Sequence, residues 1–263
     1  MKAIIKNELR LSRKLLVVWM GVVLLLCGFA YFEYLSLRDS LEELAQLVGS
    51  FPKILTIMFG ISEGVQSVFG WYGCIYYWVS FLTNGYAVYL GVSCIAKEDR
   101  QGTAEYLFTK PVSRGRIVTA KAIAGGCNLL ILAAFSGLCN YFTAVLPLGG
   151  LEREGAVFTT TTGLFLTEIT LFALSFFSSA MTRSYKRAVR WGAVLLIGFY
   201  GIYIAAGYTG ISILNYLTPL RYFDVYAVAK GGLGFSFVLT AAAAIAISLE
   251  GAKKIWSEKE IRA

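Results

Sequence analysis

A single carboxyl group, that of Glu168, interrupts an otherwise uncharged segment that spans residues 155–182. Thr161 and Ser175 lie seven residues on either side of it, so a helix would place all three on nearly the same face. A carboxyl group among hydroxyl groups inside an apolar segment can line a polar route or carry protons. The residues predicted for such a route are Glu168, Thr161, Ser175 and Asn140.

The same carboxyl group can instead hold helices together. It would then be protonated or hydrogen-bonded to an amide side chain of another apolar segment. The available amides are those of Asn140, Asn128 and Asn84. The sequence leaves the pathway and the structural interpretation open.

The residue types that usually perform catalysis or bind metals are absent or scattered. The chain has no histidine and no Gly-x4-Gly-Lys-Ser/Thr phosphate loop, which excludes nucleotide binding through that motif. Its five cysteines lie singly in apolar segments, which favours small packing residues over disulfides or a metal site. We therefore expect no catalytic residue, metal or cofactor in this chain.

A polar connection between two apolar segments is predicted to carry a short helix with defined ends. Gly102 can end the preceding helix, and Thr103 is a favourable N-cap with Glu105 in the first turn. Pro111 disfavours helical geometry at residue 110 and so ends the short helix. The apolar side chains of this helix are Tyr106, Leu107 and Phe108. Such side chains on a charged surface favour a docking site for another protein, and the alternative is a helix that rests on lipid.

The elements that position these residues follow from the composition. Apolar residues make up 57% of the 263 residues and charged residues 15%, whereas soluble domains have about 25% charged residues. This composition excludes disorder and a water-soluble globule. A bilayer core requires about 20 apolar residues per helix. The expected architecture is therefore an all-α integral membrane protein, a single transmembrane domain over residues 1–263 with spans at about 15–34, 73–96, 117–147, 157–181, 190–209 and 232–250.

The basic residues predict the orientation of these spans. Nineteen of the 24 Lys and Arg residues fall on the side that holds both termini, and five fall on the opposite side. By the positive-inside rule both termini are cytoplasmic, and the chain is a multi-pass protein of the cell membrane. Anionic lipid headgroups account for the net charge of +8, so no nucleic-acid partner is expected.

Three segments are expected at the membrane surfaces. Residues 1–14 should form an amphipathic helix along the cytoplasmic interface before the chain turns into the bilayer. Residues 36–70 should form one or two short helices at the outer surface. The aromatic residues that open the second span should form a belt at the outer interface or, alternatively, a stacking surface for a sugar or lipid substrate. They are Trp71, Tyr72, Tyr76, Tyr77 and Trp78.

The polar connection also carries a motif that resembles the membrane subunits of ABC-2 type ABC transporters. The matching pattern reads Glu98-x3-Gly102-Thr103-x-Glu105-x-Leu107-x3-Pro111-Val112-Ser113-Arg114-x2-Ile117-x3-Lys121. The six-span layout, the N-terminal amphipathic helix and the large first outer segment are also similar to that family. Outside residues 98–121 the resemblance depends on this layout.

The resemblance implies the following division of labour. Residues 98–110 would be a coupling helix seated in a cleft of a separate cytoplasmic ABC ATPase, which would bind ATP and Mg²⁺. A second membrane subunit, identical or related, would complete the transporter. The residues implied in coupling are Glu98, Gly102, Thr103, Glu105, Tyr106, Leu107, Phe108, Pro111 and Arg114.

The function expected from these features is that of a permease subunit of an ATP-driven exporter for a peptide, drug or lipid-like substrate. One alternative is a mechanical transmitter that relays ATPase motion to an extracytoplasmic partner without solute transport. Another is an ATP-independent secondary transporter, which the absence of an inverted repeat or of paired Gly/Pro-broken spans disfavours. The sequence does not select the substrate.

Overall fold

The computed structural model describes residues 1–61, 64–65, 67–101, 113–145, 155–182 and 184–258. These residues contain no strand, and six of their helices are long and apolar enough to cross a membrane. The prediction of an all-α membrane protein with six candidate spans is therefore confirmed. The long helices are α1 (Lys2–Leu37), α4 (Val68–Gln101), α6 (Arg114–Asn140), α7 (Gly155–Met181), α8 (Tyr185–Thr209) and α12 (Phe235–Glu258).

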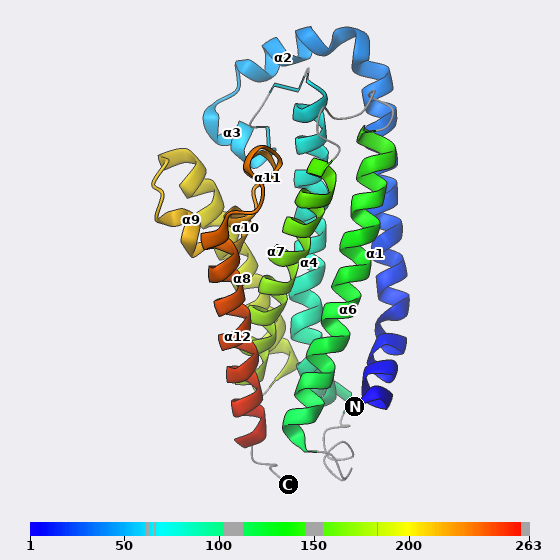
Figure 1. The fold of residues 1–263 in the computed structure, drawn as a ribbon, viewed down its shortest axis with the longest axis vertical. Helices are drawn as coiled ribbons and strands as arrows, with labels where there is room; N and C mark the ends of the chain where they lie inside the picture. Colours follow the sequence, from blue (N-terminus) through cyan, green and yellow to red (C-terminus); the bar gives the residue numbers. More distant parts are fainter. Residues whose placement is uncertain (62–63, 66, 102–112, 146–154, 183, 259–263) are drawn as a thin grey trace.

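The long helices run side by side along the longest axis of the molecule (Figure 1). The N-terminus of α1 and the C-terminal turn of α12 lie at the same end, as an even number of spans requires (Figure 1). We call this the terminal end and the other the distal end. The positive-inside prediction places the terminal end in the cytoplasm.

Short helices cover the distal end. The first outer segment contains a 3-10 turn and two helices, as expected from its apolar periodicity, with Pro52 directly before the second helix. A second group connects α8 to α12, where Gly210 ends α8 in the left-handed conformation with a φ of 71°. These elements are η1 (Arg38–Ser40), α2 (Leu41–Gly49), α3 (Lys53–Met58), α9 (Leu214–Leu217), α10 (Pro219–Tyr222) and α11 (Val225–Gly231).

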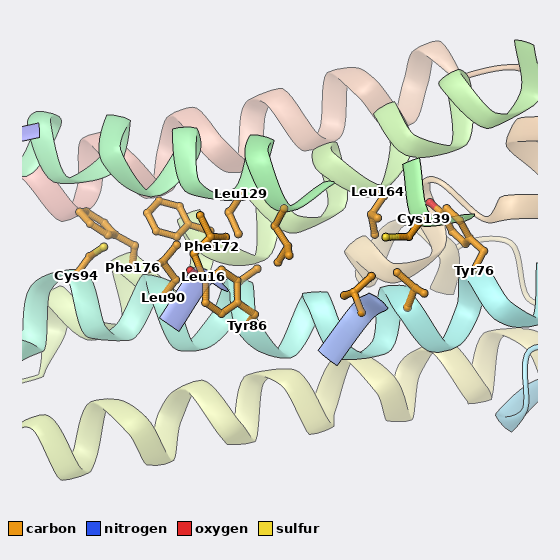
Figure 2. Packing of buried hydrophobic residues seen from close by; sticks show 14 of the residues in the cluster. Leu16, Tyr76, Tyr86, Leu90, Cys94, Leu129, Cys139, Leu164, Phe172 and Phe176 are labelled. Carbon is orange, nitrogen blue, oxygen red and sulfur yellow. The ribbon is translucent and has the colours of Figure 1, made fainter. Parts of the chain in front are cut away.

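Helix α7 forms the centre of the packing. It contacts α4, α6, α8 and α12, while α1 packs mainly on α6. Side chains from α4, α6 and α7 meet in the buried cluster of Figure 2, which includes Tyr86, Leu129, Phe172 and Phe176. In contrast, few residues of α1, α8 and α12 are buried within the chain. Their apolar outer surfaces are therefore available to lipid or to another membrane subunit.

The predicted turn between an N-terminal interface helix and the first span is wrong. Residues 2–37 form one uninterrupted helix, α1. The segment contains no proline, and its two glycines, Gly21 and Gly28, lie inside the apolar part rather than at residue 14. A helix of this length is about 54 Å long at 1.5 Å per residue, so it extends beyond a hydrocarbon core of about 30 Å.

The aromatic residues at the start of α4 largely face the protein. Trp71, Tyr72 and Tyr76 are buried, and Tyr77 and Trp78 are half-buried. The Tyr72 hydroxyl lies 2.7 Å from Thr160 Oγ1 on α7. The expected aromatic belt is thus mostly an internal cluster, because α7 and the distal helices cover this side of α4.

Candidate functional site

Glu168 lies in the middle of α7 with its side chain fully buried. The Thr83 side chain of α4 lies near its carboxyl group, but the Thr83 hydroxyl donates to the Ser80 carbonyl of its own helix at 3.4 Å. Neither carboxyl oxygen has a hydrogen-bond partner among the described residues. A buried carboxyl group without partners is energetically costly, and an ionisable residue within a membrane span is by default a candidate functional residue.

The two hydroxyl residues predicted to share the Glu168 face lie at helix–helix contacts. Thr161 packs against Gly137 of α6, where an added Cβ would lie 2.5 Å from the Thr161 hydroxyl. The Ser175 hydroxyl donates to the Phe172 carbonyl at 3.0 Å and lies against Gly91 of α4. Both side chains therefore fill the space that a glycine leaves on a neighbouring helix.

Asn140 lies at the C-terminal end of α6, one turn after Gly137. Its Oδ1 accepts from the Cys27 thiol of α1 at 3.6 Å, and the residue is buried. Three cavities in the described part of the chain, of about 40, 240 and 380 Å³, are lined by none of the four predicted pathway residues. Of the three amides considered as partners for Glu168, Asn140 and Asn128 bond to other side chains.

An ion pair that the sequence analysis missed lies near the terminal end. Lys121 Nζ is 3.4 Å from Glu8 Oε1 and donates to the Cys94 carbonyl at 2.6 Å. The Lys121 side chain is 1% exposed and that of Glu8 10%. The pair joins α1, α4 and α6 at one point. Two sequence features could have indicated this ion pair: an acidic residue within the basic N-terminal segment and a lysine two turns into an apolar helix.

Asn128 extends this polar cluster toward the middle of the bundle. Its Nδ2 donates to Ser12 Oγ of α1, and its Oδ1 accepts from the Tyr86 hydroxyl of α4 at 2.9 Å. The Ser12 hydroxyl in turn donates to the Glu8 carbonyl at 3.0 Å. In a bilayer the hydrophobic effect does not favour helix–helix contacts over helix–lipid contacts. Hydrogen bonds between helices therefore contribute to helix association.

A cavity of about 240 Å³ lies beside this cluster, between α1, α4, α6 and the start of α8. Its wall combines polar side chains, including Glu8, Ser12 and Asn128, with apolar ones such as Leu11 and Leu90. The polar cluster therefore borders open space at the terminal end and does not fill it.

The predicted coupling segment lies between the ends of α4 and α6. Residues 102–112, and with them Gly102, Thr103, Glu105, Tyr106, Leu107, Phe108 and Pro111, are outside the described residues. Glu98 belongs to the last turn of α4. Arg114 begins α6, and its Nη1 donates to the Ser257 carbonyl of α12 at 3.5 Å.

Ser113, a residue type that favours the N-cap position, is the N-cap of α6. Its carbonyl accepts from the Arg116 and Ile117 amides, while its hydroxyl makes no capping bond. The C-terminal end of α4 and the N-terminal end of α6 both lie at the terminal end of the bundle (Figure 1).

These features define the class: a multi-pass helical membrane protein whose central helix is packed through glycines and whose terminal end contains a buried polar cluster. A family model described as "ABC-2 family transporter protein" matches residues 2–249, and the chain belongs to this family. It is thus a permease component of an ABC transporter. Such components are typically not catalytic themselves, and the family implies an associated ATPase subunit and often a second membrane subunit. No curated protein matches the chain.

Proposed function

We propose that this chain is the permease subunit of an ATP-driven exporter for a peptide, drug or lipid-like substrate. The observation that carries the proposal is the family match over residues 2–249 together with the motif at residues 98–121. In this proposal residues 98–110 dock into a separate ATPase subunit that binds ATP and Mg²⁺. A second membrane subunit, identical or related, packs on the apolar surfaces of α1, α8 or α12.

The proposed mechanism is mechanical. ATP bound between two ATPase subunits draws them together, and each docked segment moves with its ATPase. Because the segment is continuous with α4 and α6, its displacement tilts both helices. Lys121 lies two turns beyond the start of α6 and is bonded to α1 and α4, so these helices are expected to move with α6.

Replacing Tyr106, Leu107 and Phe108 together by serine is expected to release the ATPase. These side chains supply the apolar contact of the proposed docking segment, and apolar contacts dominate the centre of protein interfaces. The measurement is mass spectrometry of proteins that stay bound when the tagged chain is purified in mild detergent. The expected result is a stoichiometric ATPase with a phosphate loop for the wild type and its loss for the triple variant.

A matched control replaces three exposed apolar residues at the distal end, Ile211, Ile213 and Leu217, by serine. It also removes three apolar side chains and is expected to retain the ATPase. An ATPase that remains bound to the 106–108 variant would contradict the docking assignment.

Glu168→Gln is expected to preserve assembly with the ATPase and to alter transport. Glutamine retains the shape of the side chain but cannot ionise, so a carboxyl group that carries protons or orients substrate loses that role. Transport into membrane vesicles at saturating ATP measures the effect. Thr170→Val is the control, because the buried Thr170 hydroxyl donates to the Leu166 carbonyl of its own helix. Wild-type transport by Glu168→Gln would exclude a role for the carboxyl group in the pathway.

A further inference from the structure

A small pocket lies at the distal side of the bundle, between α4, α7, α8 and the segment from α10 to α11. Its volume is about 40 Å³, and it is partly open to the surface. Five tyrosines from three elements contribute to its wall: Tyr76 and Tyr77, Tyr200 and Tyr203, and Tyr226. A water molecule needs about 10–15 Å³ of such volume, so the pocket admits one small polar group such as an ammonium group.

The tyrosine rings are fixed in place around this pocket. The Tyr76 hydroxyl donates to the Thr160 carbonyl at 2.8 Å, and the Tyr226 hydroxyl donates to the Gly60 carbonyl at 3.0 Å. The ring centroids of Tyr77 and Tyr203 are 6.0 Å apart. Because the Tyr76 and Tyr226 hydroxyl protons are already bound, these two residues offer a ligand mainly ring surface, which attracts cations.

The polar groups of the wall favour a hydrogen-bond donor. Asn84 is 2% exposed, and its Oδ1 has no hydrogen-bond partner among the described residues. The Asp224 carboxylate accepts from the Tyr226 and Ala227 amides at 3.1 and 3.2 Å and is half-buried at the pocket. A buried acceptor without a donor has a free-energy cost that a ligand N–H group would remove.

Two charged side chains lie at the pocket: Asp224 is part of its wall, and Arg221 packs on the wall residue Tyr203. Arg221 stacks on the Tyr203 ring, 4.2 Å from its centroid, and donates to the Tyr203 carbonyl at 3.2 Å, while its buried Nε has no hydrogen-bond partner among the described residues. It also illustrates that these rings hold a cation. The Asp224 carboxylate and the remaining ring faces would repel a negatively charged group and stabilise a positive one.

We propose that this tyrosine-lined pocket binds the protonated primary amine of a ligand, held by ring faces, the Asn84 carbonyl oxygen and the Asp224 carboxylate. The ammonium group donates to Asn84 Oδ1, and the rest of the ligand extends through the open side. This binding site goes beyond the permease assignment, because it requires neither an ATPase nor a transport step.

The test uses the full-length chain in dodecyl maltoside micelles and n-butylammonium as the probe. Saturation-transfer NMR is expected to show saturable binding of n-butylammonium and none of n-butanol, which has the same chain without the charge. Asp224→Asn is expected to weaken binding about tenfold, the loss of one favourable charge interaction of about 1.4 kcal/mol. Asparagine caps a helix as well as aspartate does, so α11 should remain intact.

Two further variants locate the site. Asn84→Leu removes the unpartnered acceptor at similar volume and is expected to weaken binding by a comparable factor. Ser93→Ala alters the wall of the 240 Å³ cavity at the terminal end and is expected to leave binding unchanged. Equal binding of butanol, no saturable amine binding, or full binding by both pocket variants would overturn the proposal. Equal binding of butanol would mean that the site does not recognise the charge, and absence of saturable amine binding would leave a pocket filled by water only. None of the three results bears on ATPase docking.

Discussion

Lys121→Met is expected to lower the stability of the folded chain by about 3–5 kcal/mol, the cost of removing one partner of a buried ion pair. Methionine matches the length of lysine but removes the positive charge that lies 3.4 Å from the Glu8 carboxylate, whose side chain is 10% exposed. The Cys94 carbonyl also loses a donor at 2.6 Å. The measurement is the thermal unfolding midpoint in detergent, together with the fraction of monodisperse protein.

Two comparisons separate the ion pair from a general effect of losing a lysine. The double variant Glu8→Gln/Lys121→Met replaces both charges and is expected to recover most of the stability, because a buried pair is about as stable as its neutral replacement. Lys253→Met breaks the exposed pair with Glu250, 3.3 Å apart, which contributes about 0–1 kcal/mol. If Lys121→Met unfolds at the same temperature as Lys253→Met, Glu8 is solvated without its partner, and the proposed rigid link between α1 and α6 is lost.

The six helices were predictable because the bilayer imposes a length and a composition on each span. Uncharged segments of about 20 residues can satisfy their backbone only as helices in lipid, so counting them identifies the spans without knowledge of their neighbours. The short helices of the first outer segment were equally local, because the apolar periodicity of residues 36–70 predicted them and the structure contains α2 and α3 there.

The buried ion pair was not predictable in the same way. The count of basic residues assigns Lys121 to the cytoplasmic side of the membrane. Nothing in the sequence around Lys121 indicates that Glu8 is its partner. The pairing depends on the packing of α1 on α6, which is a tertiary property. Glu8 reaches this position because α1 is continuous, whereas a turn was predicted after residue 14.

The polar stripe on α7 illustrates the limit of helical periodicity. The spacing places Thr161, Glu168 and Ser175 on one face, but it does not state what the neighbouring helices present to that face. Glycines face Thr161 and Ser175, whereas Thr83 approaches Glu168. The stripe is therefore two packing contacts around one unpartnered carboxyl group.

Gly91→Ala is expected to disrupt the contact between α4 and α7. An added Cβ would lie 2.6 Å from the Phe172 carbonyl oxygen and would collide with the Ser175 hydroxyl. The carbonyl is part of a helix backbone and cannot rotate away, so the two helices must separate. Overpacking of this kind costs about 1–3 kcal/mol. The expected result is a lower unfolding midpoint and less monodisperse protein, and a valine at the same position should increase both effects.

Gly85→Ala is the matched control on the same helix. An added Cβ at Gly85 meets nothing within 4 Å, so this variant tests the effect of alanine in α4 without a steric contact. Alanine favours the helix over glycine by about 1 kcal/mol in water, so Gly85→Ala should unfold at the wild-type temperature or slightly higher. Equal behaviour of the two variants would mean that α4 and α7 can move apart at little cost. The tight α4–α7 contact would then be unable to pass motion of α4 to the centre of the bundle, and a relay through α6 and Lys121 would have to carry it.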